Sequence, residues 1–398
     1  MKYRKMGSLG WNVSALGFGC MRLPSRRLNR LRAHVDASIR LIRYGIDQGI
    51  NYIDTAYLYH LGDSEKILGQ ALQDGYRERV RLATKLPMFL TRKTEDFDRY
   101  LHKQLKRLQT DHIDIYLFHN LNNGQFEKVK QLRLMEKMKE AKEKGLINHI
   151  GFSFHDTFPT LKNIIDFDDW DMVQIQYNYM DIGIQATTEG LTYAHSKGIA
   201  VVIMEPLKGG KLANPPSEAL DLMKSAKPDR SPVDWALQFL WNRPEVSVVL
   251  SGMGSKKMID ENCASADRSG IHSLSKEDEN TLVQIADIYR RKILVPCTTC
   301  EYCMPCPEGV NIPQNFAIVN NIALDRSLFQ RWQMKKAYKK LSGSKDKRDK
   351  NNPNGNASAC IQCGVCLEKC PQNINIPEEL KKVNAIMGKG RKISEYYP

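Results

Sequence analysis

The chain of 398 residues lacks the features that would place it in a membrane or outside the cell. No apolar run approaches the roughly 18 residues that a membrane-spanning helix needs. The first residues, MKYRKMGSLGWNVSALGFG, are too polar for the apolar core of a secretory signal peptide. These absences predict a soluble, cytoplasmic protein without membrane association. A chain of this length can bury a large core without disulfide bonds, so we expect no disulfide framework among its ten cysteines.

Eight of the ten cysteines lie in two runs, CTTCEYCMPCP (297–307) and CIQCGVCLEKCP (360–371). Each run has three thiols spaced by two residues and a fourth directly before proline, a pattern typical of four-iron, four-sulfur cluster sites. Three thiolates on one loop can reach three irons of a cube, and in two-cluster ferredoxins the Cys before Pro ligates the other cluster. One cluster is therefore predicted on Cys297, Cys300, Cys303 and Cys370, and the other on Cys360, Cys363, Cys366 and Cys306.

The first run is irregular, because two residues rather than three separate its last two cysteines. Paired C-x-x-C sites can also bind structural zinc. A zinc ribbon, however, uses only two thiols in each knuckle, so the third thiol and the Cys-Pro ending would be unexplained.

Up to about residue 265, short apolar runs alternate with amphipathic helical segments. The apolar runs are 15–19, 51–56, 80–86, 112–118, 147–154, 171–177, 199–204 and 246–252. Near-continuous apolar strands that alternate with helices predict a parallel sheet buried on both faces. Eight such units in this length match a closed (β/α)8 TIM barrel. A doubly wound open sheet is the second interpretation, but no G-x-G-x-x-G motif opens the first helix.

The expected domains are the barrel over 1–280 and a cluster domain over 281–398. A helix is predicted near residues 276–291 (KEDENTLVQIADIYRR), and about fifty residues of mostly helical pattern separate the two cysteine runs. That separation is too long for a compact bacterial ferredoxin. It favours a small α-helical two-cluster ferredoxin-like domain.

Ionisable residues follow the second, third and fourth predicted strands. Asp54 ends the second strand with Tyr59 five residues further on, Lys85 ends the third and His119 ends the fourth. In a barrel of this type the active site lies at the carboxyl ends of the strands. A nearby ammonium lowers the pKa of a tyrosine, and a tyrosine so activated can protonate a carbonyl oxygen. We therefore expect a catalytic group of Asp, Tyr, Lys and His at this rim.

At this point the sequence resembles the aldo-keto reductases over nearly all of residues 1–265. The segments NYIDTAYLYHLGDSE, LATKLP, DIYLFHNL, GFSFH, VQIQYNY, MEPLKGGKL and GMGSKKMIDEN carry the resemblance. It implies a (β/α)8 barrel that reduces carbonyls with NADP(H) or NAD(H). In that reaction Tyr59 is the general acid, Lys85 and Asp54 assist it, and His119 orients the carbonyl. The whole chain resembles the branch that carries a C-terminal 4Fe-4S ferredoxin domain.

The resemblance also implies the residues that contact the cofactor. Ser153 and Gln174 match contacts to the nicotinamide carboxamide, and a loop after the seventh strand matches the pyrophosphate site. The loop residues are Leu207, Lys208 and Gly209, and the adenosine half falls on Gly252, Ser255, Glu261 and Asn262.

The chain departs from the family pattern at three places. Met204 replaces the aromatic residue under the nicotinamide ring, and Phe154 and His155 follow Ser153 where an Asn is usual. Met258 replaces the arginine for the 2′-phosphate of NADP, with Lys256 and Lys257 beside it. A preference for NADP over NAD therefore rests on family habit alone.

The formal net charge is +14, with a dense basic stretch over residues 330–350. Nucleic-acid binding is one interpretation, but no nucleic-acid motif accompanies the stretch, and we expect no such partner. Docking of an acidic electron carrier and a solvated helix and loop are the others. An arginine-rich segment over 22–32 is interpreted as an anion-attracting or solvated loop.

Three hypotheses follow for the whole chain. The first is an oxidoreductase that reduces a small aldehyde or ketone, or oxidises the alcohol, with its two [4Fe-4S] clusters serving electron transfer. The second is the same enzyme with structural or oxygen-sensing clusters. The third is a non-enzymatic electron-transfer protein on an inactive barrel, against which the intact Asp54, Tyr59, Lys85 and His119 argue.

Overall fold

The computed structural model describes residues 1–26, 29–324, 328–342 and 355–397. The chain divides into two compact units. The first comprises Met1–Pro206 and Val233–Lys276, and the second comprises Leu207–Pro232 and Glu277–Pro398. The segment Leu207–Pro232, which follows the seventh predicted barrel strand, thus belongs to the same unit as the cysteine runs. The domain boundary near residue 280 stays a prediction.

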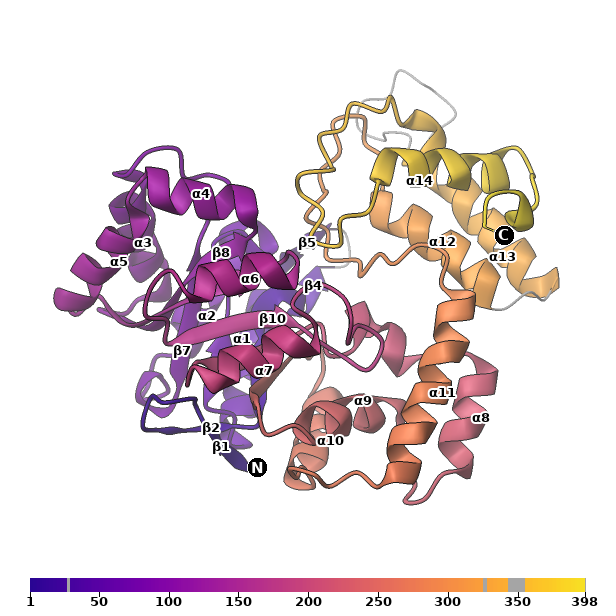
Figure 1. The fold of residues 1–398 in the computed structure, drawn as a ribbon. Coiled ribbons are helices and arrows are strands. Elements are labelled where there is room, and N and C mark those ends of the chain that lie inside the picture. Colours follow the sequence, from indigo (N-terminus) through magenta and orange to yellow (C-terminus); the bar gives the residue numbers. More distant parts are fainter. Residues whose placement is uncertain (27–28, 325–327, 343–354, 398) are drawn as a thin grey trace. The chain divides into compact units, whose positions relative to one another are not determined.

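The first unit contains a closed barrel of eight parallel strands (Figure 1), which confirms the predicted fold. In barrel order the strands are β3 (Leu16–Gly19), β6 (Tyr52–Asp54), β7 (Arg81–Leu86), β8 (Ile113–Leu121), β9 (Ile147–Phe154), β10 (Met172–Gln176), β11 (Ala200–Met204) and β12 (Val246–Ser251). Pairing of Val249 with Leu16 and of Ser251 with Phe18 closes the ring between β12 and β3. Seven of the strands fall within one of the eight apolar runs, as expected of strands that are buried on both faces. The eighth, β8, begins in the run 112–118 and extends past it to Leu121, so His119 lies near the end of this strand rather than at its last residue.

Helices follow most of the strands. They are α1 (Val35–Asp47), α2 (Asp63–Ala71), α3 (Asp96–Leu108), α4 (Asn123–Gln131), α5 (Leu134–Glu143), α6 (Phe158–Ile165), α7 (Thr187–Ser196), α9 (Pro232–Trp241) and α10 (Lys256–Asp267). The helical pattern over 128–145 is divided between α4 and α5, because Arg133 takes a left-handed conformation with φ 51°. The α5 and α7 helices end at Lys-Gly pairs, where Gly145 and Gly198 have positive φ.

Two hairpins and three 3₁₀ turns complete the first unit. One hairpin pairs β1 (Tyr3–Lys5) with β2 (Asn12–Ser14), and the other pairs β4 (Ser25–Arg26) with β5 (Asn29–Ala33). The 3₁₀ turns are η1 (Cys20–Arg22), η2 (Tyr59–Gly62) and η3 (Arg77–Arg79). Much of the arginine-rich segment expected as a loop is thus a hairpin; its residues 27 and 28 lie outside the described residues.

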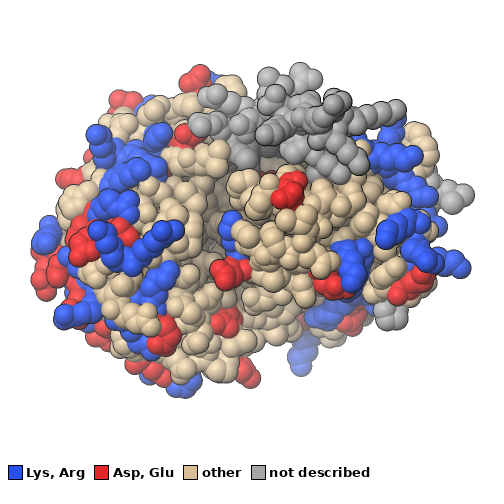
Figure 2. Space-filling model, turned by 90° about the horizontal axis from the view of Figure 1, so that it is seen from above, with Lys and Arg blue, Asp and Glu red and all other residues tan. Residues whose placement is uncertain are grey.

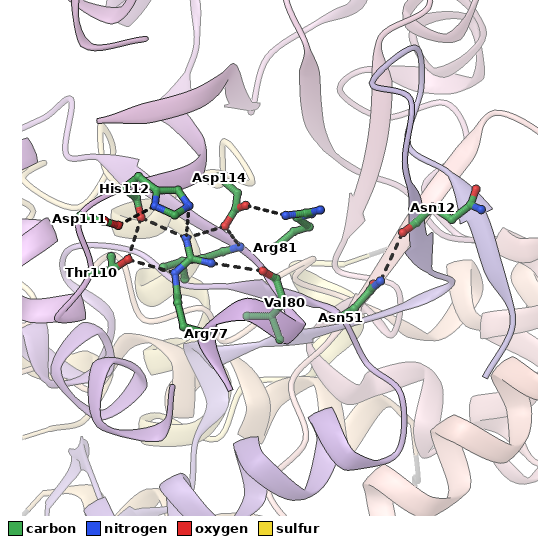
Figure 3. Close-up of polar contacts among 10 residues, drawn as sticks. Asn12, Asn51, Arg77, Val80, Arg81, Thr110, Asp111, His112 and Asp114 are labelled. Carbon is green, nitrogen blue, oxygen red and sulfur yellow. Dashed lines mark hydrogen bonds and ion pairs between the residues drawn. The ribbon is translucent and has the colours of Figure 1, made fainter. Parts of the chain in front are cut away.

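The amino-terminal ends of β7 and β8 are held together by buried charge (Figure 3). Asp114, almost fully buried, accepts from Arg77 at 2.8 Å, from Arg81 at 3.3 Å and from the backbone N–H of Leu82 at 2.9 Å. Arg77 also donates to Thr110. This group lies at the end of the barrel opposite to the carboxyl ends of the strands, where polar groups usually serve stability.

The second unit is helical in its described part, as the pattern between the cysteine runs predicts. Its elements are η4 (Lys208–Ala213), α8 (Ser217–Ser225), α11 (Lys276–Lys292), α12 (Ile312–Leu324), α13 (Leu328–Leu341), η5 (Ala357–Ala359), α14 (Ile376–Val383), the π-helical turn η6 (Asn384–Gly388) and η7 (Ile393–Glu395). Arg230 pairs with Asp278 at 2.7 Å and Lys292 with Glu218 at 3.2 Å, so the segment 207–232 is tied to α11. Residues 343–354, most of a polar stretch of the sequence between the two cysteine runs, lie outside the described residues.

Basic and acidic side chains are interspersed over the outer parts of the face shown in Figure 2. Elsewhere in the described chain, as well, surface lysines form ion pairs, such as Lys139 with Asp168 and Lys142 with Asp171. Within the described ranges, no helix is both long and apolar enough to cross a membrane.

Candidate active site and cluster sites

The carboxyl ends of β6 and β7 carry a buried ion pair. Lys85 Nζ lies 2.7 and 2.8 Å from the two carboxylate oxygens of Asp54 and donates to the carbonyl oxygen of Thr55 at 2.9 Å. Lys85 is 1% exposed and Asp54 3% exposed. A charge pair this deep persists only when its geometry is good and its other hydrogen bonds are made, and both conditions hold here.

Tyr59 and His119 lie beside this pair. Lys85 Nζ is 5.4 Å from the centroid of the Tyr59 ring. The rings of Tyr59 and His119 are 6.2 Å apart, with an angle of 81° between their planes. The structure therefore brings together the four residues that the sequence predicts for catalysis.

Burial controls the charges in this group. Burial, reinforced by the Lys85 charge, holds the pKa of His119 well below its usual range, so the imidazole is neutral at physiological pH. Burial also raises the pKa of Asp54, whereas Lys85 and Gln174 act to lower it. A neutral histidine can donate one hydrogen bond to an uncharged oxygen without adding a second cation beside Lys85.

A site residue that the sequence reasoning missed is Phe89, in the turn after β7. Its side chain is 46% exposed and its ring lies 6.5 Å from that of His119. The signal was available, since an aromatic residue in the loop that follows LATKLP sits at the active-site rim. Phe89 gives the site an apolar wall next to the histidine.

A buried polar network behind the catalytic group was also missed. Arg107 on α3 donates to the carbonyl oxygen of Tyr57 at 3.1 Å and pairs with Glu65 on α2 at 2.9 Å. Glu65 is fully buried and also accepts from Thr84 at 2.9 Å. Gln104 donates to Glu65 and, at 3.1 Å, to the backbone carbonyl of Lys85. One network thus contacts both the segment before Tyr59 and the strand that carries Lys85.

The two residues matched to the nicotinamide carboxamide lie on neighbouring strands, β9 and β10. Ser153 Oγ accepts from the backbone N–H of Asn120 at 2.8 Å, and Gln174 Nε2 lies 3.3 Å from Asp54. Gln174 Oε1 is buried, and no group in the described part of the chain donates to it. A buried amide oxygen without a donor fits the N–H of a carboxamide, so these residues suit a nicotinamide.

The residues matched to the adenosine half surround the turn between β12 and α10. Ser255 caps α10 by accepting from the N–H of Met258, and Asn262 is buried and donates to Ser251. Glu261 is exposed and lies 3.7 Å from Lys257. A Cβ added at Gly252 would lie 2.9 Å from the Cβ of Arg22, so the Arg22 side chain crosses this turn.

The environment of Met258 bears on the choice between NADP and NAD. Met258 is 50% exposed, and Lys256 Nζ lies 4.5 Å from the centroid of the Tyr44 ring. Lys257 Nζ lies 3.7 Å from the Glu261 carboxylate. Each lysine beside Met258 therefore already contacts another side chain, Tyr44 for Lys256 and Glu261 for Lys257.

Two cavities in the second unit gather the cysteines in the predicted groups. One is lined by Cys297, Cys300, Cys303 and Cys370. The other is lined by Cys306, Cys360, Cys363 and Cys366, with Cys303 also touching it. Among the described residues, no three His, Cys, Asp or Glu side chains converge as they would on a single metal ion. Four thiols around each cavity fit a larger group such as a four-iron cluster.

The electrostatics of the thiols follow the same grouping. Burial first, then Cys300, Cys297 and Cys370, raises the pKa of Cys303 well above its usual value. Burial, with Cys360, Cys363 and Cys306, raises the pKa of Cys366 to about 11. Cys303 and Cys366 would thus resist ionisation until a cation is bound beside them.

The two cysteine runs share one backbone geometry. In the first run Thr299 and Glu301, on either side of the second cysteine, have φ of 54° and 66°. In the second run Gln362 and Gly364 occupy the equivalent positions with φ of 58° and 77°. Three of these four residues are not glycine, so both loops hold a conformation that costs free energy on its own.

The basic helix α13 presents both exposed and buried faces. Lys335 and Lys336 are exposed, and Trp332 is 59% exposed with Lys336 Nζ 5.2 Å from its ring. Tyr338, by contrast, is buried in the core of the unit and donates to Asn384. The rest of the basic stretch, 343–350, lies outside the described residues. Docking of an acidic carrier there stays a prediction.

The other two cysteines, Cys20 and Cys263, are buried, and burial raises the pKa of each. Both are therefore poor nucleophiles and serve as small residues of the core.

A closed parallel barrel with a buried Asp-Lys pair, a tyrosine and a neutral histidine at its carboxyl rim defines an oxidoreductase domain. The profile of the aldo/keto reductase family matches residues 15–287, and that of a 4Fe-4S dicluster domain matches residues 296–375. The chain therefore belongs to the aldo/keto reductase family and carries a 4Fe-4S dicluster domain. Both parts of the predicted family resemblance are confirmed.

Similar proteins cover the barrel. The uncharacterized oxidoreductase YqkF of Bacillus subtilis is 28% identical over 297 residues, which span 67% of this chain and 91% of that protein. The holo form of the aldo-keto reductase AKR11C1 from Bacillus halodurans superposes with a TM-score of 0.60 at 26% identity, over 72% of this chain and 96% of that one. An aldo-keto reductase from Klebsiella pneumoniae, solved in complex with NADPH, gives a TM-score of 0.60 at 24% identity, over 72% and 95%.

Proposed function

We propose that the barrel reduces a small aldehyde or ketone to the alcohol with NADPH or NADH, and that two [4Fe-4S] clusters in the second unit serve electron transfer. The observation that carries the proposal is the buried Lys85–Asp54 pair beside the rings of Tyr59 and His119. These groups supply what carbonyl reduction needs, an acid for the oxygen and a donor that orients it.

Tyr59 is the proposed general acid. It gives its phenolic proton to the carbonyl oxygen, and the resulting phenolate lies next to the Lys85 ammonium, whose charge favours it. Asp54 and the Thr55 carbonyl hold that ammonium in place. The proton leaves Tyr59 as the carbon gains hydride, so no charged alkoxide has to form in a site walled by Phe89.

His119 is the proposed orienting group. Because its pKa is held low by burial, it meets the substrate as a neutral imidazole. A neutral donor fixes the direction of the carbonyl without competing with Tyr59 to protonate it. The same arrangement run backwards oxidises an alcohol.

The bound nicotinamide would supply or accept the hydride. Gln174 Oε1 and the Ser153 hydroxyl are the proposed contacts to its carboxamide, since one is a buried acceptor without a donor among the described residues. Leu207, Lys208 and Gly209 are proposed for the pyrophosphate, and Gly252, Ser255, Glu261 and Asn262 for the adenosine half. That a similar reductase from Klebsiella pneumoniae was solved with NADPH supports this cofactor.

Each cluster is proposed to be bound by the four thiols that line its cavity. The clusters would pass single electrons to or from a redox partner, for which an acidic carrier at α13 is a candidate. The contact between Thr298, in the first cysteine run, and Gly209 also supports a structural role for the cluster bound by that run.

The test is a pair of tyrosine substitutions two residues apart. We expect Tyr59→Phe to lower kcat for carbonyl reduction by about 100-fold or more, the usual value of a general acid. Tyr57→Phe is the matched control. Tyr57 packs its ring against Tyr100 and Arg107, contacts that phenylalanine retains.

The assay follows NADPH absorbance without oxygen against a panel of aldehydes and ketones. Full activity in Tyr59→Phe, or equal losses in the two variants, would refute the assignment of Tyr59.

A further inference from the structure

The loop matched to the cofactor pyrophosphate belongs to the compact unit that holds the cysteine runs. It comprises Leu207 and the 3₁₀ turn Lys208–Ala213, which directly follow the last residues of the barrel segment. Lys208 is only 3% exposed, and Lys208, Gly209 and Gly210 all have positive φ. The loop is thus a tightly wound structure rather than an open connection.

Gly209 lies directly against the first cysteine run. A Cβ added at Gly209 would be 2.1 Å from the carbonyl oxygen of Thr298 and 3.0 Å from its Cα. Thr298 follows Cys297 in the chain and is 1% exposed. Only glycine permits this approach, so the backbone at Gly209 and the peptide beside a predicted cluster ligand form one packed contact.

Further contacts tie the loop to the chain just before Cys297. Lys211 Nζ donates to the carbonyl oxygen of Val295 at 3.4 Å, and the hydroxyl of Tyr289 donates to the carbonyl oxygen of Lys211 at 2.9 Å. Val295 is itself clamped by Asn320, which accepts from its N–H and donates to its carbonyl oxygen. The loop therefore contacts Val295 and Tyr289, which precede the first cysteine run in the chain.

The first cysteine run holds an unfavourable backbone conformation at two residues. Thr299 has φ 54°, a conformation that β-branched residues rarely adopt, and Glu301 has φ 66°. Such residues persist only where the surroundings over-determine them. Iron–sulfur bonds to the thiols on either side of Thr299 would supply such a constraint. Without those bonds Thr299 could relax, and the Thr298 carbonyl that lies against Gly209 would move with it.

We propose that the cluster bound by the first cysteine run is the structural support of the dinucleotide-binding loop. With the cluster in place, the Thr298 carbonyl holds Gly209 and its neighbours in the conformation that binds the cofactor. When the cluster is lost, the loop loses this support and cofactor affinity falls. The proposal rests on the proposed function, because it takes the pyrophosphate to bind at this loop.

The coupling is reciprocal by thermodynamic necessity. If cluster occupancy raises the affinity for the dinucleotide, dinucleotide binding stabilises the cluster by the same factor. Couplings between sites of this kind are typically about 5- to 150-fold in affinity.

The first experiment measures NADPH affinity by fluorescence titration without oxygen on the full chain. Three samples are compared: the cluster-loaded protein, the protein stripped with a chelator and an oxidant, and the stripped protein reconstituted with ferrous iron and sulfide. We expect the dissociation constant to rise at least about fivefold on stripping and to return on reconstitution. Circular dichroism checks that the barrel stays folded in each sample. Equal dissociation constants in the three folded samples would overturn the proposal.

The second experiment keeps both clusters and changes the contact between Gly209 and the Thr298 carbonyl. It therefore tests the proposal even if the stripped protein unfolds. Gly209→Ala forces the Thr298 carbonyl away, whereas Gly390→Ala adds the same methyl at another positive φ of the second unit, outside the proposed binding loop and with nothing within 4 Å. We expect only Gly209→Ala to weaken NADPH binding by about fivefold or more and to alter the EPR spectrum of one dithionite-reduced cluster. Equal effects of the two variants would refute the contact's role.

A failure of this proposal can be distinguished from a failure of the proposed function. Carbonyl turnover lost in Tyr59→Phe tests the catalytic group, whatever the affinity measurements give. Cluster-loaded protein that binds neither NADPH nor NADH would overturn both proposals. Tight binding that does not depend on the clusters or on Gly209 would overturn this one alone.

Discussion

Arg107 connects the loop that carries the proposed acid, Tyr59, to the strand that carries Lys85. Its guanidinium donates to the carbonyl oxygen of Tyr57 and pairs with the fully buried Glu65. Glu65 in turn accepts from Thr84, the residue before Lys85. Replacing Arg107 with methionine keeps an unbranched side chain against the Tyr57 ring but removes the charge and the donors.

The expected cost comes mainly from the carboxylate left behind. Removing one partner of a buried ion pair typically costs about 3–5 kcal/mol, because the other charge stays buried without compensation. Arg107 is 15% exposed, so water can partly replace it, and the lower end of the range applies. We therefore expect Arg107→Met to lower the free energy of unfolding by about 3 kcal/mol.

The kinetic consequence should be a loss of turnover without a loss of cofactor binding. The Tyr57 carbonyl lies two residues before Tyr59, and small misplacements of a catalytic group can lower rates by about 100-fold. We expect kcat to fall by about 10- to 100-fold, while the dissociation constant of NADPH stays unchanged, since no cofactor contact is proposed for Arg107.

Urea unfolding followed by tryptophan fluorescence measures the stability, because Trp235 and Trp241 are both fully buried in the barrel unit. Arg133→Met is the matched control. It removes an arginine whose pair with Glu136 is exposed on both sides, and such pairs contribute at most about 1 kcal/mol. Equal destabilisation by the two substitutions, or a kcat that Arg107→Met leaves intact, would refute the reasoning.

Two further predictions concern single residues. Glu301 is exposed and holds φ 66° where the second run has Gly364, so Glu301→Gly should stabilise the cluster-loaded protein by up to about 1 kcal/mol; an earlier release of iron on heating would contradict this. Burial lowers the pKa of His155 to about 4, so the stability that its neutral form contributes is complete above pH 6.5 and is lost as pH falls toward 4. By linkage this amounts to at most about 2 kcal/mol between pH 8 and pH 5. His155→Gln should flatten that part of the urea-midpoint profile, and an unchanged profile would show that His155 does not carry the effect.

The barrel could be predicted because its signals are local and repeated. Each of the eight strands begins in a short apolar run, and the carboxyl-terminal parts of the second, third and fourth place Asp54, Lys85 and His119 at one rim by topology alone. The grouping of the cysteines followed from spacing for a similar reason, since a loop with three thiols two residues apart can surround only one cavity.

The supporting contacts could not be predicted in this way. Arg107 and Glu65 lie on different helices 42 positions apart, and neither has a local pattern that marks it as buried. Charged residues on amphipathic helices usually face water, so their pairing depends on the packing of α2 against α3. The left-handed backbone at Thr299 and Arg133 was equally hidden, because neither residue type favours it.

The segment 207–232 shows most clearly which contacts a single sequence cannot predict. Its sequence follows the seventh strand and matches the family's pyrophosphate loop, so a reading along the chain assigns it to the barrel. Its contacts at Gly209, Lys211 and Arg230 are with the chain beyond residue 277 instead. A glycine that approaches a carbonyl nearly ninety residues away leaves no signal in a single sequence.

The number of electrons transferred separates the two roles that the clusters can have. A nicotinamide gives up two electrons together as hydride, whereas each cluster accepts one, so direct exchange needs a converter such as a flavin. We expect anaerobically purified protein with about eight irons per chain to show a reduced-cluster EPR signal with dithionite but none with NADPH alone. A signal on adding NADPH would contradict this and would require such a converter. Silence, together with cluster-dependent NADPH affinity, would mean that the first cluster affects the barrel reaction through the position of a loop, while any electron transfer runs to a separate carrier.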